Sequence, residues 1–140
     1  MKFRIFSLAL LLILLTAFNK VGHLHTLYVK IDNIVLKKGT LYIAIYANKD
    51  NFLKNPFMKI RIKVQSSKIN CEFKNVPDGE YSMAIFQDLN ENKKLDKILF
   101  MPIEPYGFSG NGKGSIGTPT YENTKFFCKN DITLTIQLTN

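Results

Sequence analysis

The 140-residue sequence contains no tryptophan and only two histidines and two cysteines. The shortage of histidine limits catalysis, because a serine or cysteine nucleophile of the hydrolytic type needs a histidine beside it. His23 and His25 lie two positions apart near the start of the chain, with no distant histidine to complete a catalytic or metal site. The absence of tryptophan removes a common sugar-stacking platform. We therefore expect a protein that is not an enzyme.

The sequence also has no cluster of charge of one sign. Lysine and arginine outnumber aspartate and glutamate by 19 to 11, and the formal net charge is +8, but the basic residues are scattered. A nucleic-acid surface usually interleaves basic residues with aromatic ones, so that bases stack while phosphates are neutralised. We interpret the charge as a solvated surface and expect no nucleic-acid partner.

A single hydrophobic run exceeds the length of a strand. It extends from Ile5 to Phe18, after the basic residues Lys2 and Arg4. This is signal-peptide length, since a spanning helix needs about 20 apolar residues. We predict that residues 1–18 are a signal peptide, with Ala17 near the cleavage site, and that the mature protein is periplasmic or extracellular without a membrane span. An uncleaved signal anchor is the alternative.

The rest of the chain, residues 24–140, is long enough for one domain and short for two. The sequence is 46% hydrophobic and 12% aromatic, which is typical of a globular protein. Several segments have hydrophobic residues at every second position, the period of a half-buried strand. We expect strands at 27–32, 40–47, 60–65, 69–73, 81–86 and 132–139.

Because 40–47 is apolar on both faces, we expect it to be a central strand. No segment has a sustained helical period, although short helical turns are expected near 50–57. These features predict an all-β fold, a single antiparallel β-sandwich of about seven strands. The residues Val76-Pro77-Asp78-Gly79 predict a tight hairpin turn in which Gly79 takes positive φ. The region 88–122 is predicted as a long loop, and loops of that length are often functional.

Cys71 and Cys128 are an even pair in a chain expected to be exported. In an oxidising compartment such a pair usually forms a disulfide. Closing this loop would stabilise the fold by about 4 kcal/mol in the chain-entropy account. The alternative is two buried free thiols on separate strands.

Oxygen-bearing side chains recur after the strand 81–86, in the pattern of a calcium loop. They occupy loop positions 1, 3, 5 and 9, a backbone carbonyl is expected at position 7, and a further carboxylate follows; the set is Asp88, Asn90, Asn92, Asp96, Lys94 (carbonyl) and Glu104. Lys93 and Leu99 replace the glycine and the bidentate glutamate of the usual scheme. Two interpretations therefore stay open: a metal-free turn of self-bonded Asx side chains, which we favour, and weak calcium binding.

Several blocks of the sequence together resemble a known family: 88–96, Pro102, 104–109, 76–84 and 119–126. It is a family of exported bacterial proteins catalogued as domain of unknown function 2141 (DUF2141). The resemblance implies a transthyretin-like or immunoglobulin-like sandwich and no established activity. Members of the family usually have glycine where this chain has Lys93 and Phe100.

Tyr106 and Phe108 lie in a segment that also contains Pro105 and Gly107, and they are candidates for an aromatic contact surface. We favour the alternative, in which both rings pack back onto the sandwich. The glycines of 107–117 lack the strand-then-helix context of a phosphate loop, so we expect a flexible loop.

Three functions remain. We prefer a non-catalytic binding or adhesion module that presents 88–109 to a protein, peptide or glycan. The alternatives are a structural accessory protein of the cell envelope without a metal site, and a hydrolase that uses carboxylates from Asp88, Asp96 and Glu104.

Overall fold

The computed structural model describes residues 22–110 and 119–139. Its architecture is mostly β, with several open sheets and one short helix. The strands are β1 (Leu24–Asp32), β2 (Thr40–Tyr46), β3 (Met58–Lys63), β4 (Ile69–Pro77), β5 (Gly79–Asp88), β6 (Lys97–Ile98), β7 (Met101–Pro102), β8 (Tyr106–Phe108), β9 (Lys125–Cys128) and β10 (Ile132–Gln137), and the helix is α2 (Tyr121–Thr124). The expected signal peptide 1–18 and most of the glycine segment 107–117 lie outside the described residues.

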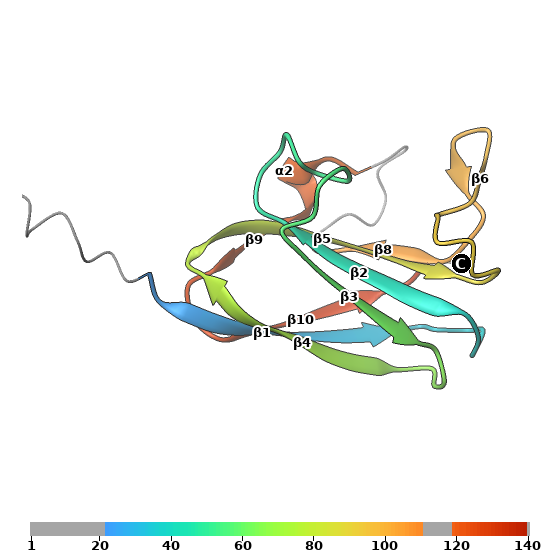
Figure 1. Ribbon diagram of the computed structural model, residues 1–140, viewed down its shortest axis with the longest axis horizontal. Coiled ribbons are helices and arrows are strands. Elements are labelled where there is room, and N and C mark those ends of the chain that lie inside the picture. The colour runs from blue at the N-terminus through green and yellow to red at the C-terminus, as the bar shows by residue number, and fades with distance from the viewer. Residues whose placement is uncertain (1–21, 111–118, 140) are drawn as a thin grey trace, which may run out of the picture.

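The two larger sheets lie in two layers (Figure 1). One has three strands in the order β10-β1-β4, and the other has five, in the order β3-β2-β5-β8 with β9 also paired to β5. Both sheets contribute side chains to one buried core, which includes Leu27, Val29, Ile31 and Phe73 from the first sheet and Leu41, Ile43, Ile45, Met83 and Ile85 from the second. Removal of this apolar surface from water is the main force that stabilises the fold.

Residue alternation determines which side chains enter the core. In β10 the side chains alternate between buried or half-buried and exposed along the strand, as the sequence predicts. β2 lies between β3 and β5, which confirms the prediction of a central strand at 40–47. Its inward residues are fully buried, while Tyr42, Ala44 and Tyr46 point to the outer side of the sheet.

The structure confirms the mostly-β fold that the sequence predicts, but corrects the antiparallel pairing and the number of about seven strands. The structure has ten strands within the described residues, and β1 pairs with β10 in parallel, from Leu27↔Ile132 to Asp32↔Gln137. The reason is that β1 and β10 start from the same end of the molecule. The Asp78 N–H donates to the His23 carbonyl at 3.2 Å, and Gly79 pairs with Cys128, directly before β10.

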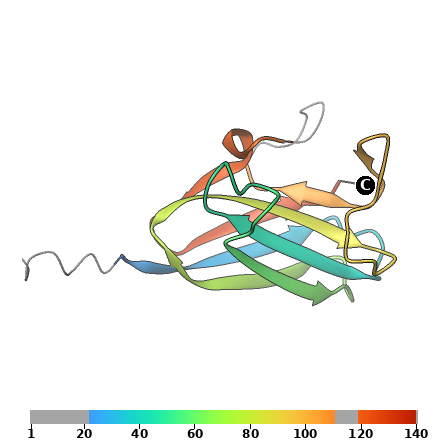
Figure 2. The ribbon, with the colours of Figure 1, turned by 45° about the horizontal axis from the view of Figure 1, so that its top comes forward.

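The prediction of a hairpin at 76–79 is also wrong, although the tight turn exists. β4 pairs with β1, whereas β5 pairs with β2, so the turn carries the chain from one layer to the other (Figure 2). Gly79 does not have positive φ; among the described glycines, Gly39 and Gly110 do. A Cβ at Gly79 would lie 3.1 Å from the Tyr81 ring, closer than ordinary van der Waals contact, so a larger residue there would have to displace that ring.

The region 88–122 is more ordered than a long loop. Its described part contains β6, β7, β8 and α2. The 47–57 segment, expected to contain helical turns, forms hydrogen-bonded turns in which the Asn55 N–H donates to the Asn51 carbonyl at 2.9 Å. This segment and the β6–β7 hairpin rise on the same side of the five-stranded sheet (Figures 1 and 2). Within 22–110 and 119–139, no helix has the length and hydropathy needed to cross a bilayer.

Candidate functional site

The predicted cation loop begins at Asp88, the last residue of β5. The Asp88 side chain is 0% exposed, and its carboxylate accepts hydrogen bonds from the N–H groups of Asn92 (3.2 Å) and Lys93 (2.7 Å). The Asn90 side-chain oxygen accepts from the Asn92 N–H at 3.1 Å, and the Asn92 oxygen from the Lys94 N–H at 2.9 Å. Such bonds let short polar side chains determine the turn. Lys93 has φ 66°, the left-handed conformation of the glycine that the usual calcium loop has there.

Two further carboxylates hold the loop closed. The Asn90 and Asn92 amides donate to Asp96 at 2.7 and 2.9 Å. Glu104 is 6% exposed and accepts from the N–H groups of Leu89 (2.7 Å) and Asp96 (3.0 Å). The structure therefore brings all five side chains of the predicted calcium set into one hydrogen-bonded cluster.

The side-chain oxygens of the cluster accept hydrogen bonds from backbone N–H groups and from the asparagine amides. All three of its carboxylates, and both asparagine side-chain oxygens, already accept hydrogen bonds from the protein. Within the described residues, no group of three or more His, Cys, Asp or Glu side chains is placed to hold a metal ion. The hydrogen bonds are those of the self-bonded Asx turn, and calcium binding stays a prediction.

Tyr106 and Phe108 lie on β8, next to the loop, and both are half-buried. Their rings contact edge to face with centroids 6.0 Å apart. Gly107 faces the core between them, where a Cβ would lie 2.8 Å from the Ile136 side chain. The two rings therefore point outward from the sheet, neither fully exposed as a contact surface nor fully packed away.

These rings belong to rows of side chains that cross the outer face of the five-stranded sheet. Strand register places Arg61, Tyr42, Phe86 and Tyr106 in one row across β3, β2, β5 and β8. The Tyr42 and Phe86 rings stack at 4.9 Å. The next row is Lys59, Ala44, Ala84 and Phe108. Two alanines at its centre leave a hollow beside the stacked rings.

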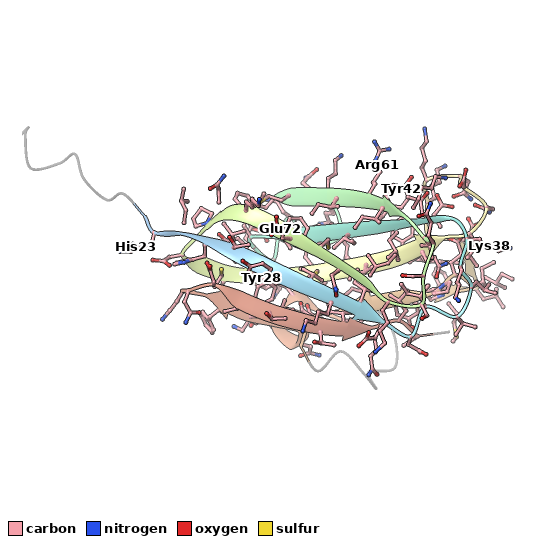
Figure 3. All side chains as sticks on the ribbon, turned by 90° about the horizontal axis from the view of Figure 1, so that it is seen from below. His23, Tyr28, Lys38, Tyr42, Arg61 and Glu72 are labelled. Atoms are coloured by element: carbon pink, nitrogen blue, oxygen red, sulfur yellow. The ribbon has the colours of Figure 1, made fainter. Side chains whose placement is uncertain are left out.

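A cavity of about 750 Å³, which we call the aromatic groove, lies over this hollow. Leu53 and Pro56 of the 47–57 segment line it, as do Phe100 and Met101 of the hairpin. Three of its described lining residues are cationic, Lys59, Arg61 and Lys97, and none of them is acidic. Figure 3 shows Arg61 and Tyr42 close together, on the side of the molecule away from Tyr28 and Glu72.

The groove has the properties of a ligand site. Such sites usually measure about 300–1,000 Å³ and are lined by apolar and aromatic side chains with a few polar groups. Sequence reasoning found Tyr106 and Phe108 but missed the rest, because the rows depend on register between strands distant in sequence. Ala44 between two outward tyrosines was the available signal.

The two cysteines are free thiols in the structure, so the expected disulfide between them is not formed. They lie in different sheets, Cys71 on β4 opposite Val29 and Cys128 on β9 opposite Gly79. Burial raises the pKa of the Cys71 thiol to about 11. Burial, and then the nearby carboxylates of Asp78 and Asp131, raises the pKa of Cys128. A raised pKa keeps both sulfurs protonated at neutral pH and poor as nucleophiles.

The other polar groups that resemble catalytic sets hold the fold together. The His25 Nε2 lies 2.6 Å from an Asp78 carboxylate oxygen, which ties the start of β1 to the turn between the layers. Ser82 and Thr124 share a buried hydroxyl hydrogen bond of 2.6 Å, which ties α2 to β5. Sequence reasoning did not anticipate either contact.

Comparison with known proteins shows that the chain matches one protein family. The family described as "Uncharacterized protein conserved in bacteria (DUF2141)" matches residues 29–135. No curated protein and no solved structure matches the chain. Since the family match covers well over half of the sequence and most of both sheets, the chain belongs to the DUF2141 family.

Proposed function

We propose that this protein is a non-catalytic binding module whose ligand lies in the aromatic groove. The observation that supports this most strongly is the pair of rows across the outer sheet face. Ala44 and Ala84 form the floor, and the stacked rings of Tyr42 and Phe86 form a wall. A row of small residues beside large rings leaves apolar surface open to a ligand, whereas an outer sheet face normally carries polar side chains.

The chemistry of the lining restricts the ligand. Aromatic and aliphatic side chains favour an apolar or planar group, and Lys59, Arg61 and Lys97 favour a negative charge. A planar or apolar anion fits both properties. The described lining residues include no carboxylate, so the groove lacks the acid pair that a hydrolase would need.

We also propose that the two layers are a β-sandwich of the transthyretin-like or immunoglobulin-like kind, and that residues 1–18 direct its export. The shared core of two open sheets supports the first part. The basic start and apolar run of the N-terminal segment support the second. Mass spectrometry of the protein recovered from the periplasm or the medium would locate the N-terminus; a start before residue 17 would contradict cleavage near Ala17.

A planar aromatic anion tests the groove. The probe is anilinonaphthalene sulfonate, which fluoresces when it enters an apolar site, and the protein lacks residues 1–18. Every buried core residue of the described chain lies between Leu27 and Leu138, so this form keeps the whole core. Filling the hollow by Ala44→Leu or Ala84→Leu is expected to weaken probe binding by about tenfold or more, because the floor is occupied.

Two controls make the result specific. Thr135→Leu adds a similar side chain to an exposed position on the other sheet and is expected to leave probe binding unchanged. Arg61→Gln is expected to weaken binding of the sulfonate but not of uncharged anilinonaphthalene. Equal binding by the parent, Ala44→Leu and Ala84→Leu proteins would overturn the proposal.

A further inference from the structure

The β6–β7 hairpin exposes several large apolar side chains to solvent. It consists of Lys97–Ile98, a two-residue turn, and Met101–Pro102. The exposed fractions are 87% for Leu99 and 94% for Phe100 at the turn, and 61% for Ile98 and 71% for Met101 beside it. Single exposed hydrophobic residues are ordinary, but four consecutive large ones indicate a surface that contacts another apolar phase.

The turn residues are also unfavourable for the conformation that they adopt. Leu99 and Phe100 have φ of 47° and 72°. Two successive positive φ values are typical of a type I′ turn, which strongly prefers Asn-Gly. Bulky residues with a Cβ are strained in that region. The hairpin therefore holds two large apolar side chains at its tip at the expense of local stability, and they gain little burial in return.

The surroundings of the tip are basic on the solvent side. Lys97 begins the hairpin, and Lys93 and Lys94 are exposed in the loop before it. The neighbouring carboxylates are directed elsewhere: Glu104 and Asp88 are buried against backbone N–H groups, Asp96 accepts from two asparagine amides, and Glu91 pairs with Lys63. The formal charge of the whole sequence is +8, and loss of Lys2 and Arg4 with residues 1–18 leaves +6, which adds a general attraction to anionic surfaces.

We infer that the hairpin tip docks on anionic lipid membranes, with Leu99 and Phe100 inserted among the lipid headgroups and Lys97 at headgroup level. The exposed lysines beside the tip complement the negative charge of anionic lipid headgroups, and the exposed apolar side chains at the tip can enter the interface. Aromatic and aliphatic side chains inserted at the interface, together with nearby lysines, are the usual elements of peripheral membrane binding. This inference does not depend on which ligand the aromatic groove binds.

The test is sedimentation of the protein lacking residues 1–18 with vesicles of phosphatidylcholine, alone or mixed with phosphatidylglycerol. The parent is expected to bind the mixed vesicles at least about fivefold more tightly than phosphatidylcholine alone. The double variant L99N/F100G, which places the preferred Asn-Gly pair at the turn, is expected to lose about tenfold or more in affinity while remaining folded. Lys97→Gln is expected to reduce the preference for the anionic vesicles.

The hairpin and the groove share Lys97, Phe100 and Met101, so the matched control changes the groove at a residue outside the hairpin. Ala44→Leu fills the groove without touching the tip and is expected to bind vesicles like the parent protein. Equal vesicle binding by the parent and L99N/F100G would overturn the inference, as would no vesicle binding by the parent. A parent protein that sediments as a dimer, with L99N/F100G monomeric, would also overturn it, because the tip would then cover a second copy.

Discussion

Two neighbouring segments of this protein are built in opposite ways. The loop 88–96 is polar, and its carboxylates and amides accept or donate hydrogen bonds within the protein. The hairpin 97–102 that follows is apolar at its tip, and its largest side chains are exposed. A loop whose polar groups are satisfied internally has a structural explanation already. The exposed apolar hairpin and the aromatic groove beside it have none, so we place function there.

The comparison shows why oxygen spacing alone is weak evidence for a metal. Alternating Asp and Asn side chains can converge on a cation, but they can equally cap the N–H groups of their own turn. In this protein Glu104 joins two N–H groups eight and fifteen residues away in sequence, and so closes the loop by itself. Polar residues with a complete set of internal partners require no ligand.

The largest expected effect on the free energy of unfolding comes from a substitution that opens the polar loop 88–96. Glu104→Ala removes the acceptor of two part-buried N–H groups and is expected to lower the free energy of unfolding by about 3 kcal/mol. Urea denaturation measures this difference. Glu91→Ala, an exposed carboxylate paired with Lys63, is the control and is expected to change it by less than about 1 kcal/mol. Equal effects of the two variants would show that Glu104 does not hold the loop.

Cysteine labelling measures the loss of stability in Glu104→Ala without denaturant. Cys128 is 0% exposed, so iodoacetamide reaches it only when the structure opens. Its labelling rate is expected to rise by about a hundredfold in E104A, in proportion to the stability lost, and to stay at or below the parent rate in L99N/F100G. A fast rate in the parent protein at neutral pH would contradict the burial of this thiol.

The pH dependence of Cys71 labelling gives a separate check. Its pKa is raised to about 11 by burial, so the reactive thiolate is scarce at neutral pH and increases as the pH approaches that value. We expect labelling of the native protein to increase with pH until well above pH 9, and labelling of the unfolded protein to level off earlier. A native profile that matched the unfolded one would contradict the raised pKa.

In the apolar hairpin 97–102, substitution is expected to raise the free energy of unfolding instead of lowering it. L99N/F100G places turn-forming residues at two positions with positive φ and is expected to raise the free energy of unfolding by about 1–2 kcal/mol. The same denaturation experiment measures it. A loss of stability in this variant would mean that Leu99 and Phe100 pack usefully in the folded protein, and the contrast between the two segments would fail.

Calcium is expected to have the smallest effect. Since the side-chain oxygens of the loop already accept hydrogen bonds, about 5 mM calcium is expected to stabilise the protein by less than about 1 kcal/mol. Melting temperature with magnesium as the control measures this. A larger shift with calcium alone, abolished by Asp96→Asn, would contradict our interpretation of the loop and support the calcium site that the sequence predicts.

The sequence predicted the local features of the fold well and its long-range features poorly. Period-two alternation located β1, β3 and β10, because inward and outward side chains alternate within a single strand, and an apolar run located β2. It could not show that β1 and β10 run in parallel or that β4 and β5 lie in different sheets. Those facts depend on where distant strands meet, for example at Asp78 and His23. The same limit hid the aromatic groove, whose rows join residues from four strands.

For the candidate site, the sequence predicted which oxygen-bearing residues come together, and calcium binding by them stays a prediction. Asp88 to Phe108 was recognised as unusual, and its polar residues do converge on one another. Whether those oxygens are free or already bonded depends on backbone conformation, which spacing does not reveal. In the sequence, Leu99 and Phe100 are only departures from an expected pattern, because exposure depends on the fold.

The most direct test of the central claim is amide chemical-shift mapping of Leu99→Asn, without residues 1–18, during titration with anilinonaphthalene sulfonate. This variant removes an exposed apolar side chain of the tip and leaves every described lining residue of the groove in place. Our account predicts that the largest shifts occur on β2, β5 and β8, around Ala44, Ala84 and Tyr106, and that they disappear in the added presence of Ala44→Leu. Shifts concentrated in the loop 88–96, or on the outer face of the three-stranded sheet, would contradict it.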